Sequence, residues 1–224
     1  MGTNVQLIAG DGFKLSAYRA DAAGSPRGAI VVVQEIFGVN SHIKSVADGY
    51  AADGYLVVAP AMFDRAQRNY DTGYSPPEIE AGRKVMQGLD WNNTMKDVAA
   101  AVAAARSAGK VGMVGYCWGG LLTWRAAAKV SGLSAAAPYY GGGMTTPEES
   151  ALAPKVPVLA HFGNQDHWIP LDTIEAFKKA HPEVEVHVYE SGHGFNCDQR
   201  GSYNADAAKL ARERTLAFFA KHLA

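Results

Sequence analysis

Short continuous apolar runs alternate along this chain with longer segments that carry apolar residues at helical spacing. Apolar runs of about four to eight residues are typical of buried strands, and apolar positions recurring every three to four residues are typical of helices. The predicted strands are residues 5–8, 14–19, 29–34, 55–59, 111–114, 135–140, 156–162 and 184–190. The predicted helices are residues 41–53, 78–89, 95–108, 121–129, 171–180 and 206–223. This alternation predicts an α/β fold with a mostly parallel central sheet and helices on both faces.

Local signals refine this outline. The turn Gly10-Asp11-Gly12 predicts that the first two strands form a hairpin. Ser41 and Asp172 are predicted N-caps of their helices. Residues 61–77 are irregular and rich in aromatic side chains, and a loop of this length predicts a functional segment over a site. We expect one domain spanning residues 1–224, because no repeat, linker or composition break divides the chain.

Composition narrows the classes of protein. The 48% hydrophobic content supports a large core, and a formal net charge of −1 offers no basic surface for nucleic acid or anionic lipid. The first residues lack the pattern of a secretory signal, and no apolar run is long enough to cross a bilayer. We therefore expect a cytoplasmic monomer with neither nucleic acid nor membrane as partner. Its two cysteines, Cys117 and Cys197, are expected to be free thiols.

The segment 115–120, GYCWGG, lies between a predicted strand and a predicted helix. It has the Gly-x-nucleophile-x-Gly spacing of a nucleophile elbow, a sharp turn that holds a reactive side chain out of the fold, with Cys117 at the nucleophile position. The N-terminus of the following helix favours a thiolate. A small buried hydrophobic residue is the alternative role for a lone cysteine. The rest of the chain favours the nucleophile.

A thiol nucleophile needs a base, and that base needs an orienting acceptor. In hydrolases with such an elbow the order is nucleophile, acid, histidine, each after a strand. Asp166 follows the predicted strand 156–162, and His193 follows the strand 184–190, flanked by glycines. The sequence therefore predicts Cys117, His193 and Asp166 as the catalytic group.

The other histidines are weaker candidates. His161 is expected to be packed within a strand, and His167 and His187 are expected to point elsewhere. The histidines expected at surface or helix-cap positions are His42, His181 and His222. No pair of histidines has metal-ligand spacing completed by a cysteine or carboxylate, so no metal is predicted. No dinucleotide or Walker-type glycine motif occurs in the expected context, so no cofactor is predicted either.

The loop 34–38, QEIFG, follows the strand that supplies half of the oxyanion hole in such folds. The backbone amides of Ile36 and Trp118 are the predicted donors to the oxyanion. Glu35 is unusual there, because its charge opposes both a thiolate and an oxyanion. Either it is a solvated or arginine-paired loop residue, or it regulates the thiol.

Four motifs together resemble the dienelactone hydrolase (carboxymethylenebutenolidase) family, over nearly the whole chain. They are QEIFG at 34–38, GYCWGG at 115–120, QDH at 165–167 and GHGF at 192–195. The resemblance implies an α/β-hydrolase fold with Cys117 as nucleophile, His193 as base and Asp166 as its orienting acceptor. It also implies that Glu35 holds the resting thiol neutral, until a substrate carboxylate displaces Glu35 and the glutamate takes the thiol proton.

The chain departs from the family where the substrate binds. The family holds the substrate carboxylate with two arginines, one of them four residues after the catalytic histidine, and Cys197 stands at that position. Arg200 and Arg83 are the candidate replacements. Phe37 and Tyr74, together with Tyr70 and Trp118, are candidate walls of a compact aromatic pocket.

The resulting prediction is a cysteine-dependent hydrolase of a small-molecule ester or lactone. The resemblance points to dienelactone (4-carboxymethylenebut-2-en-4-olide), opened to maleylacetate through an acyl-enzyme. A broader carboxylesterase or thioesterase on the same residues is the first alternative. A non-catalytic small-molecule sensor is the second.

Overall fold

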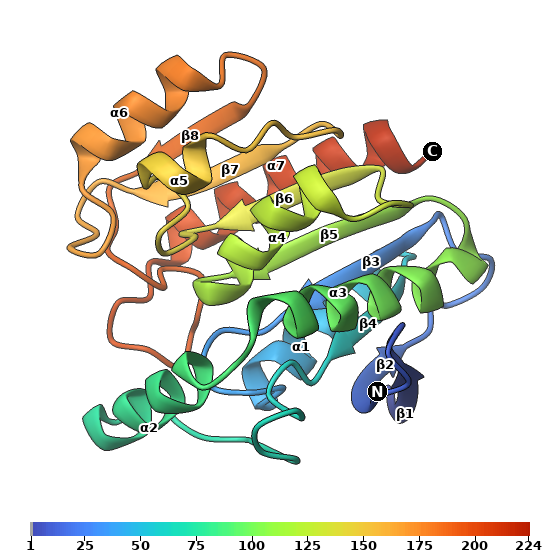
Figure 1. Cartoon of the computed structure of the whole chain (residues 1–224). Coiled ribbons are helices and arrows are strands. Elements are labelled where there is room, and N and C mark those ends of the chain that lie inside the picture. The colour runs from blue at the N-terminus through green and yellow to red at the C-terminus, as the bar shows by residue number, and fades with distance from the viewer. Residues whose placement is uncertain (1) are drawn as a thin grey trace.

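A computed structural model describes residues 2–224 of the chain. Eight strands form one sheet in the order β1-β2-β4-β3-β5-β6-β7-β8 (Figure 1). The strands are β1 (Thr3–Ile8), β2 (Lys14–Ala20), β3 (Ala29–Val33), β4 (Leu56–Pro60), β5 (Val111–Tyr116), β6 (Ala135–Tyr139), β7 (Leu159–Gly163) and β8 (Glu185–Tyr189). The β1–β2 hairpin and the β2–β4 pair are antiparallel, and all other pairs are parallel.

Helices cover both faces of this sheet. They are α1 (Ser41–Ala52), α2 (Pro76–Gln87), α3 (Trp91–Ala105), α4 (Trp118–Lys129), α5 (Pro147–Ser150), α6 (Leu171–Ala180) and α7 (Ala205–Leu223), with a 3₁₀ turn at Arg106–Ala108. Helices α3 and α4 pack together on one face, where Trp124 of α4 contacts Phe177 of α6. On the other face Tyr50 of α1 contacts Phe219 of α7. Figure 1 shows α2 beyond the carboxyl ends of the strands.

The sheet topology brings several loops to one edge. Strand β3 lies between β4 and β5 in the sheet. After β4, which pairs with one side of β3, the chain crosses over to form β5 on the other side of β3. Such a reversal opens a crevice at the carboxyl ends of the strands, where ligands bind in open α/β sheets. The loops after β3, β5, β7 and β8 therefore converge there.

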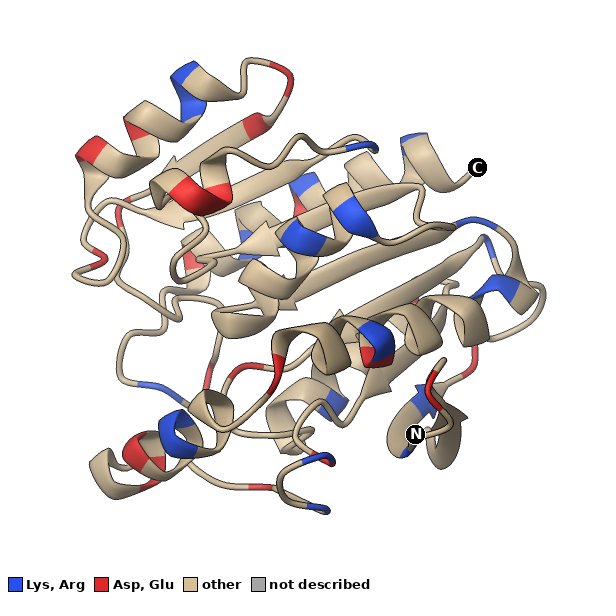
Figure 2. Ribbon diagram, viewed as in Figure 1, with Lys and Arg blue, Asp and Glu red and all other residues tan. Residues whose placement is uncertain are grey.

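Every residue of β3, β4, β5, β6 and β7 is buried, as expected for parallel strands covered on both faces. Charged residues lie mainly on helices and loops, with both signs interspersed (Figure 2). Among the described residues no helix is both long and apolar enough to cross a membrane.

The predicted α/β architecture is confirmed, with local corrections. The N-cap of α1 is Asn40, whose side chain accepts a hydrogen bond from the Ile43 amide, rather than Ser41. The N-cap of α6 is Pro170, and Asp172 lies inside the first turn, where its charge favours the helix dipole. Strand β7 begins at Leu159 rather than at residue 156. The short helix α5 was not predicted, because four residues are too few to show a helical period.

Candidate active site

Cys117 occupies the strand-to-helix turn between β5 and α4 in a strained backbone conformation. Its φ and ψ angles are 55° and −117°, outside the regions that a non-glycine residue normally adopts. A Cβ atom at Gly119 would lie 2.5 Å from the carbonyl oxygens of Val33 and Gln34, so the close packing of β3 against α4 requires glycine there. The amide of Cys117 donates to the Tyr139 carbonyl at 3.0 Å and fixes the turn.

The three predicted catalytic side chains form one chain of contacts. Nε2 of His193 lies 3.0 Å from Sγ of Cys117, and Nδ1 lies 2.7 Å from Oδ2 of Asp166. The second carboxylate oxygen of Asp166 accepts from the Trp168 amide at 2.8 Å. Because a buried carboxylate accepts the proton on Nδ1, the opposite nitrogen faces the thiol and can exchange a proton with it.

The surroundings of His193 favour its protonated form. Burial by itself lowers the pKa of this imidazole, but the negative charge at Cys117 and the hydrogen bond to Asp166 outweigh burial and raise the pKa to about 10. A protonated His193 beside Cys117 would stabilise a thiolate there. A thiolate in such a pair is an effective nucleophile at neutral pH.

Glu35 forms a buried ion pair with Arg200. Its side chain is 1% exposed, and Oε1 accepts from the Arg200 guanidinium at 2.8 Å. Sγ of Cys117 is directed at His193, and the other carboxylate oxygen, Oε2, has no hydrogen-bond partner among residues 2–224. Arg200 follows His193 by seven residues rather than four, yet it reaches the site from the loop after β8.

Arg200, Arg83 and Phe37 line a cavity of about 390 Å³ in front of Cys117 and His193. Its walls are mainly apolar and include Trp91, Trp118 and Trp168. The Arg83 guanidinium lies 5.1 Å from the centre of the Trp168 ring, at cation–π distance. The structure thus brings both candidate arginines to the same cavity.

The amides predicted to form the oxyanion hole also lie beside this cavity. Ile36 and Trp118 both line it. Within the described part of the chain neither amide donates to a backbone acceptor, as expected for Trp118 at the start of α4. Their role as oxyanion donors stays a prediction.

Tyr74 lies behind the cavity rather than on its wall. Its ring packs edge-on against Phe37 at 4.5 Å, and its hydroxyl accepts from the Asn40 side chain at 2.9 Å. Tyr70 packs in a similar way against Phe63, at 5.3 Å. The aromatic loop 61–75 therefore supports the site from behind.

Cys197 is buried and faces Glu35. Burial and the negative charge of Glu35 raise the pKa of its thiol to about 11. The thiol is therefore protonated at neutral pH, so Cys197 is a poor nucleophile.

His42 was predicted at a surface or helix-cap position, and this prediction was wrong, because the residue lies in the first turn of α1 and is only 4% exposed. The helical period carried the missing signal, because His42, Val46 and Tyr50 are spaced four residues apart and share one face of α1. His161 is buried as predicted, with hydrogen bonds to Tyr189 at 2.8 Å and Thr215 at 3.0 Å.

An elbow at the end of β5 and a Cys–His–Asp chain at the carboxyl edge of a mostly parallel sheet place the protein among the α/β hydrolases. Comparison with known proteins narrows this class. Residues 15–223 match the profile of the dienelactone hydrolase family, and the chain belongs to that family.

Its relatives include the carboxymethylenebutenolidases of Pseudomonas putida and Pseudomonas knackmussii. Each is 36% identical over 221 residues, which cover 94% of this chain and 92% of the relative. A crystal structure from Klebsiella pneumoniae, provisionally assigned as a dienelactone hydrolase, superposes with a TM-score of 0.85 at 30% identity and covers 99% of both chains. The protein is a hydrolase that acts on ester or lactone bonds.

Proposed function

We propose that this enzyme opens a small lactone that carries a carboxylate, with Cys117 as nucleophile and dienelactone as the leading substrate. The observation that carries the proposal is the contact chain from Cys117 through His193 to Asp166, which opens onto a cavity that holds two arginines. The named activity of the Pseudomonas relatives supports the same substrate.

The reaction begins with proton transfer from Cys117 to Glu35, which leaves a thiolate beside protonated His193. The thiolate attacks the lactone carbonyl carbon, and the carbonyl electron pair moves to oxygen, which accepts from the amides of Ile36 and Trp118. Collapse of this tetrahedral adduct breaks the ring C–O bond. The ring oxygen becomes an enolate, which is still part of the acyl group bound to Cys117. His193 returns its proton to this leaving group.

Hydrolysis of the thioester completes the cycle. His193, now neutral, removes a proton from water, whose oxygen attacks the acyl carbon. The C–S bond breaks, and Cys117 recovers its thiolate or, with a proton from His193, its thiol. Asp166 keeps the imidazole in one orientation during both half-reactions.

The substrate carboxylate is assigned to Arg200, with Arg83 as the second cation. Arg200 already holds one carboxylate, that of Glu35, so its geometry suits this class of anion. A substrate carboxylate that replaces Glu35 on Arg200 releases the glutamate. Glu35 can then accept the thiol proton, which couples formation of the thiolate to the arrival of substrate.

The test is steady-state hydrolysis of cis- and trans-dienelactone beside a neutral aryl acetate, by wild type and Cys117→Ala. We expect fast turnover of a dienelactone that Cys117→Ala abolishes. Turnover of the aryl acetate alone would instead identify a broader esterase on the same residues. Undiminished activity of Cys117→Ala would remove Cys117 from the mechanism.

A further inference from the structure

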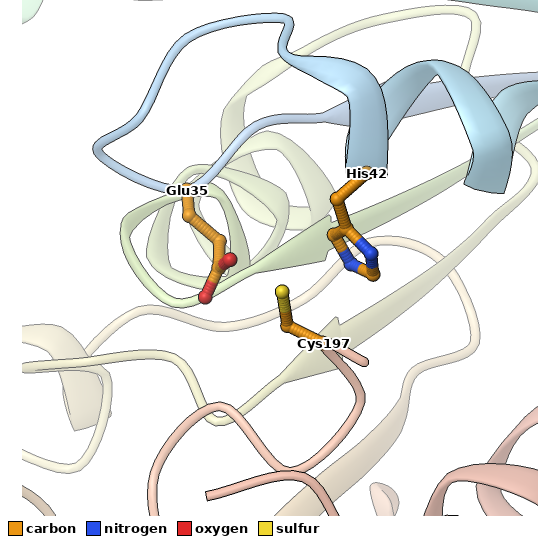
Figure 3. Close-up of side chains that lie close together, drawn as sticks. All are labelled: Glu35, His42 and Cys197. Carbon is orange, nitrogen blue, oxygen red and sulfur yellow. The ribbon is translucent and has the colours of Figure 1, made fainter. Parts of the chain in front are cut away.

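Three buried side chains meet behind the catalytic cavity. Glu35 comes from the loop after β3, His42 from the first turn of α1, and Cys197 from the loop after β8. One donor atom from each lies within 4.8 Å of the other two. Figure 3 shows the carboxylate, imidazole and thiol pointing toward a common space.

Two polar atoms of these three side chains have no hydrogen-bond partner in the described part of the chain. Oε2 of Glu35 and Nε2 of His42 have no hydrogen-bond partner within residues 2–224, although both are buried. A buried polar atom without a partner costs about 1–3 kcal/mol, so each such atom needs an explanation. A cation held between them would supply the missing partner to both.

The remaining polar atoms of His42 and Glu35, Nδ1 and Oε1, already have hydrogen-bond partners that leave Nε2 and Oε2 free for a metal ion. Nδ1 of His42 lies 3.2 Å from Oδ1 of Asp198, and a carboxylate in this position orients the histidine of metal sites and leaves Nε2 free for the ion. Arg200 contacts Oε1 of Glu35, so Oε2 remains available.

The donor set selects the kind of metal. A thiolate, an imidazole and a carboxylate together suit Zn²⁺, whose bonds to sulfur, nitrogen and oxygen are about 2.3, 2.0 and 2.1 Å long. In a tetrahedral site such bonds place the donors about 3.5 Å apart, so the longest separation must shorten by about 1.3 Å at most. A divalent cation displaces the thiol proton of Cys197 and so gains a thiolate ligand, while the second anionic ligand is the Glu35 carboxylate, which also pairs with Arg200.

A second cavity lies beside His42. This cavity of about 370 Å³ lies between α1 and the segments around α7, and its walls include His42, Tyr50, Tyr116 and Asp198. Cys117 does not line it. Glu35 and Cys197 do not line it either, so this cavity borders the cluster only on the side of His42.

We propose that Glu35, His42 and Cys197 form an inhibitory site for Zn²⁺ or a similar thiophilic divalent cation, with water as the fourth ligand. A bound ion fixes Glu35, which then cannot accept the proton of Cys117. Binding does not depend on the proposed function. The inhibitory effect rests on the proposed function, because inhibition requires that Glu35 move during turnover.

The binding test uses Co²⁺ as a spectroscopic probe and Zn²⁺ as its competitor. We expect one equivalent of Co²⁺ to produce a thiolate charge-transfer band in wild type and in Cys117→Ala, and Zn²⁺ to abolish the band. Cys197→Ser and, separately, His42→Gln should lose it, with circular dichroism showing that each variant is folded. A band that survives in Cys197→Ser but disappears in Cys117→Ala would overturn the proposal, as would the absence of any band in wild type.

The regulatory test measures dienelactone hydrolysis with and without Zn²⁺, because a substrate carboxylate is what displaces Glu35 from Arg200. We expect Zn²⁺ to lower kcat/KM about tenfold in wild type and to have little effect on Cys197→Ser. Equal inhibition of both proteins would refute regulation through this site. If no ester or lactone is turned over, the proposed function fails, and the Co²⁺ titration still decides whether the site binds metal.

Discussion

Removal of the Arg200 guanidinium should weaken hydrolysis of a carboxylate-bearing lactone far more than that of a neutral ester. Arg200 pairs with Glu35 at 2.8 Å inside the cavity, and the same guanidinium is proposed to hold the substrate carboxylate. A hydrogen bond between charged groups contributes about 1.5–3 kcal/mol. At 1.36 kcal/mol per factor of ten, its loss corresponds to a decrease of about 10- to 150-fold in kcat/KM.

The buried carboxylate of Glu35 complicates the single variant Arg200→Gln. Removal of one partner of a buried ion pair typically costs about 3–5 kcal/mol, because the remaining charge is left unpaired. The comparison is therefore made between Glu35→Gln and the double variant Glu35→Gln/Arg200→Gln, neither of which leaves an unpaired carboxylate. Arg200→Lys keeps the charge without the planar fork and serves as an intermediate control.

The assay measures kcat/KM for dienelactone and for phenyl acetate with these variants. We expect kcat/KM of Glu35→Gln/Arg200→Gln to be about 10- to 150-fold lower than that of Glu35→Gln for dienelactone, and less than about threefold lower for phenyl acetate. An equal loss for both substrates would show that Arg200 acts through the structure of the site. No loss for dienelactone would place its carboxylate elsewhere.

Four further predictions concern the site and the elbow. Asp166→Asn should reduce kcat about 10³- to 10⁴-fold, because the imidazole loses its correct tautomer, and a rate near that of wild type in steady-state assays would contradict this role. By NMR of labelled histidine, His193 should be protonated at pH 8 in wild type, where its pKa is about 10, and neutral in Cys117→Ala, where burial acts without the thiolate charge. Because this pKa lies above the usual 6.5, the protonated imidazole of His193 stabilises the fold fully below pH 6.5, and this stabilisation is lost as the pH rises through about 10. The difference in the free energy of unfolding between wild type and Cys117→Ala should therefore change with pH. A difference that stays constant from pH 6 to 10 would exclude this linkage. Gly119→Ala places a Cβ 2.5 Å from two carbonyl oxygens and should lower the free energy of unfolding in urea by about 2–3 kcal/mol, whereas Gly10→Ala, with open space around it, should change it by less than about 0.5 kcal/mol.

Much of the fold was predictable because its strands are buried on both faces. Continuous apolar runs such as those that became β3 and β4 are easily recognised, and the order of the motifs placed Cys117, Asp166 and His193 on three neighbouring loops. The N-cap residue of α1 could not be predicted, because Asn40 and Ser41 are adjacent and both suit an N-cap.

The surroundings of the catalytic group were harder to predict. Arg200 and Cys197 lie in the irregular segment 190–204, whose path depends on tertiary contacts rather than on any period. The position of Tyr74 depends on its packing against Phe37 and its hydrogen bond with Asn40. The cluster of Glu35, His42 and Cys197 joins the connection between β3 and α1 to the loop after β8, about 155 residues further along the chain, so no ligand spacing along the chain reveals it.

The most direct test of the central claim is to trap the covalent intermediate. Wild type is mixed with an activated acyl ester, quenched in acid within the first turnover and digested for peptide mass spectrometry. We expect a thioester adduct on the peptide that carries Cys117, present in Cys197→Ser and absent in Cys117→Ala. Turnover without an adduct on Cys117, or with the adduct on Cys197, would contradict that claim.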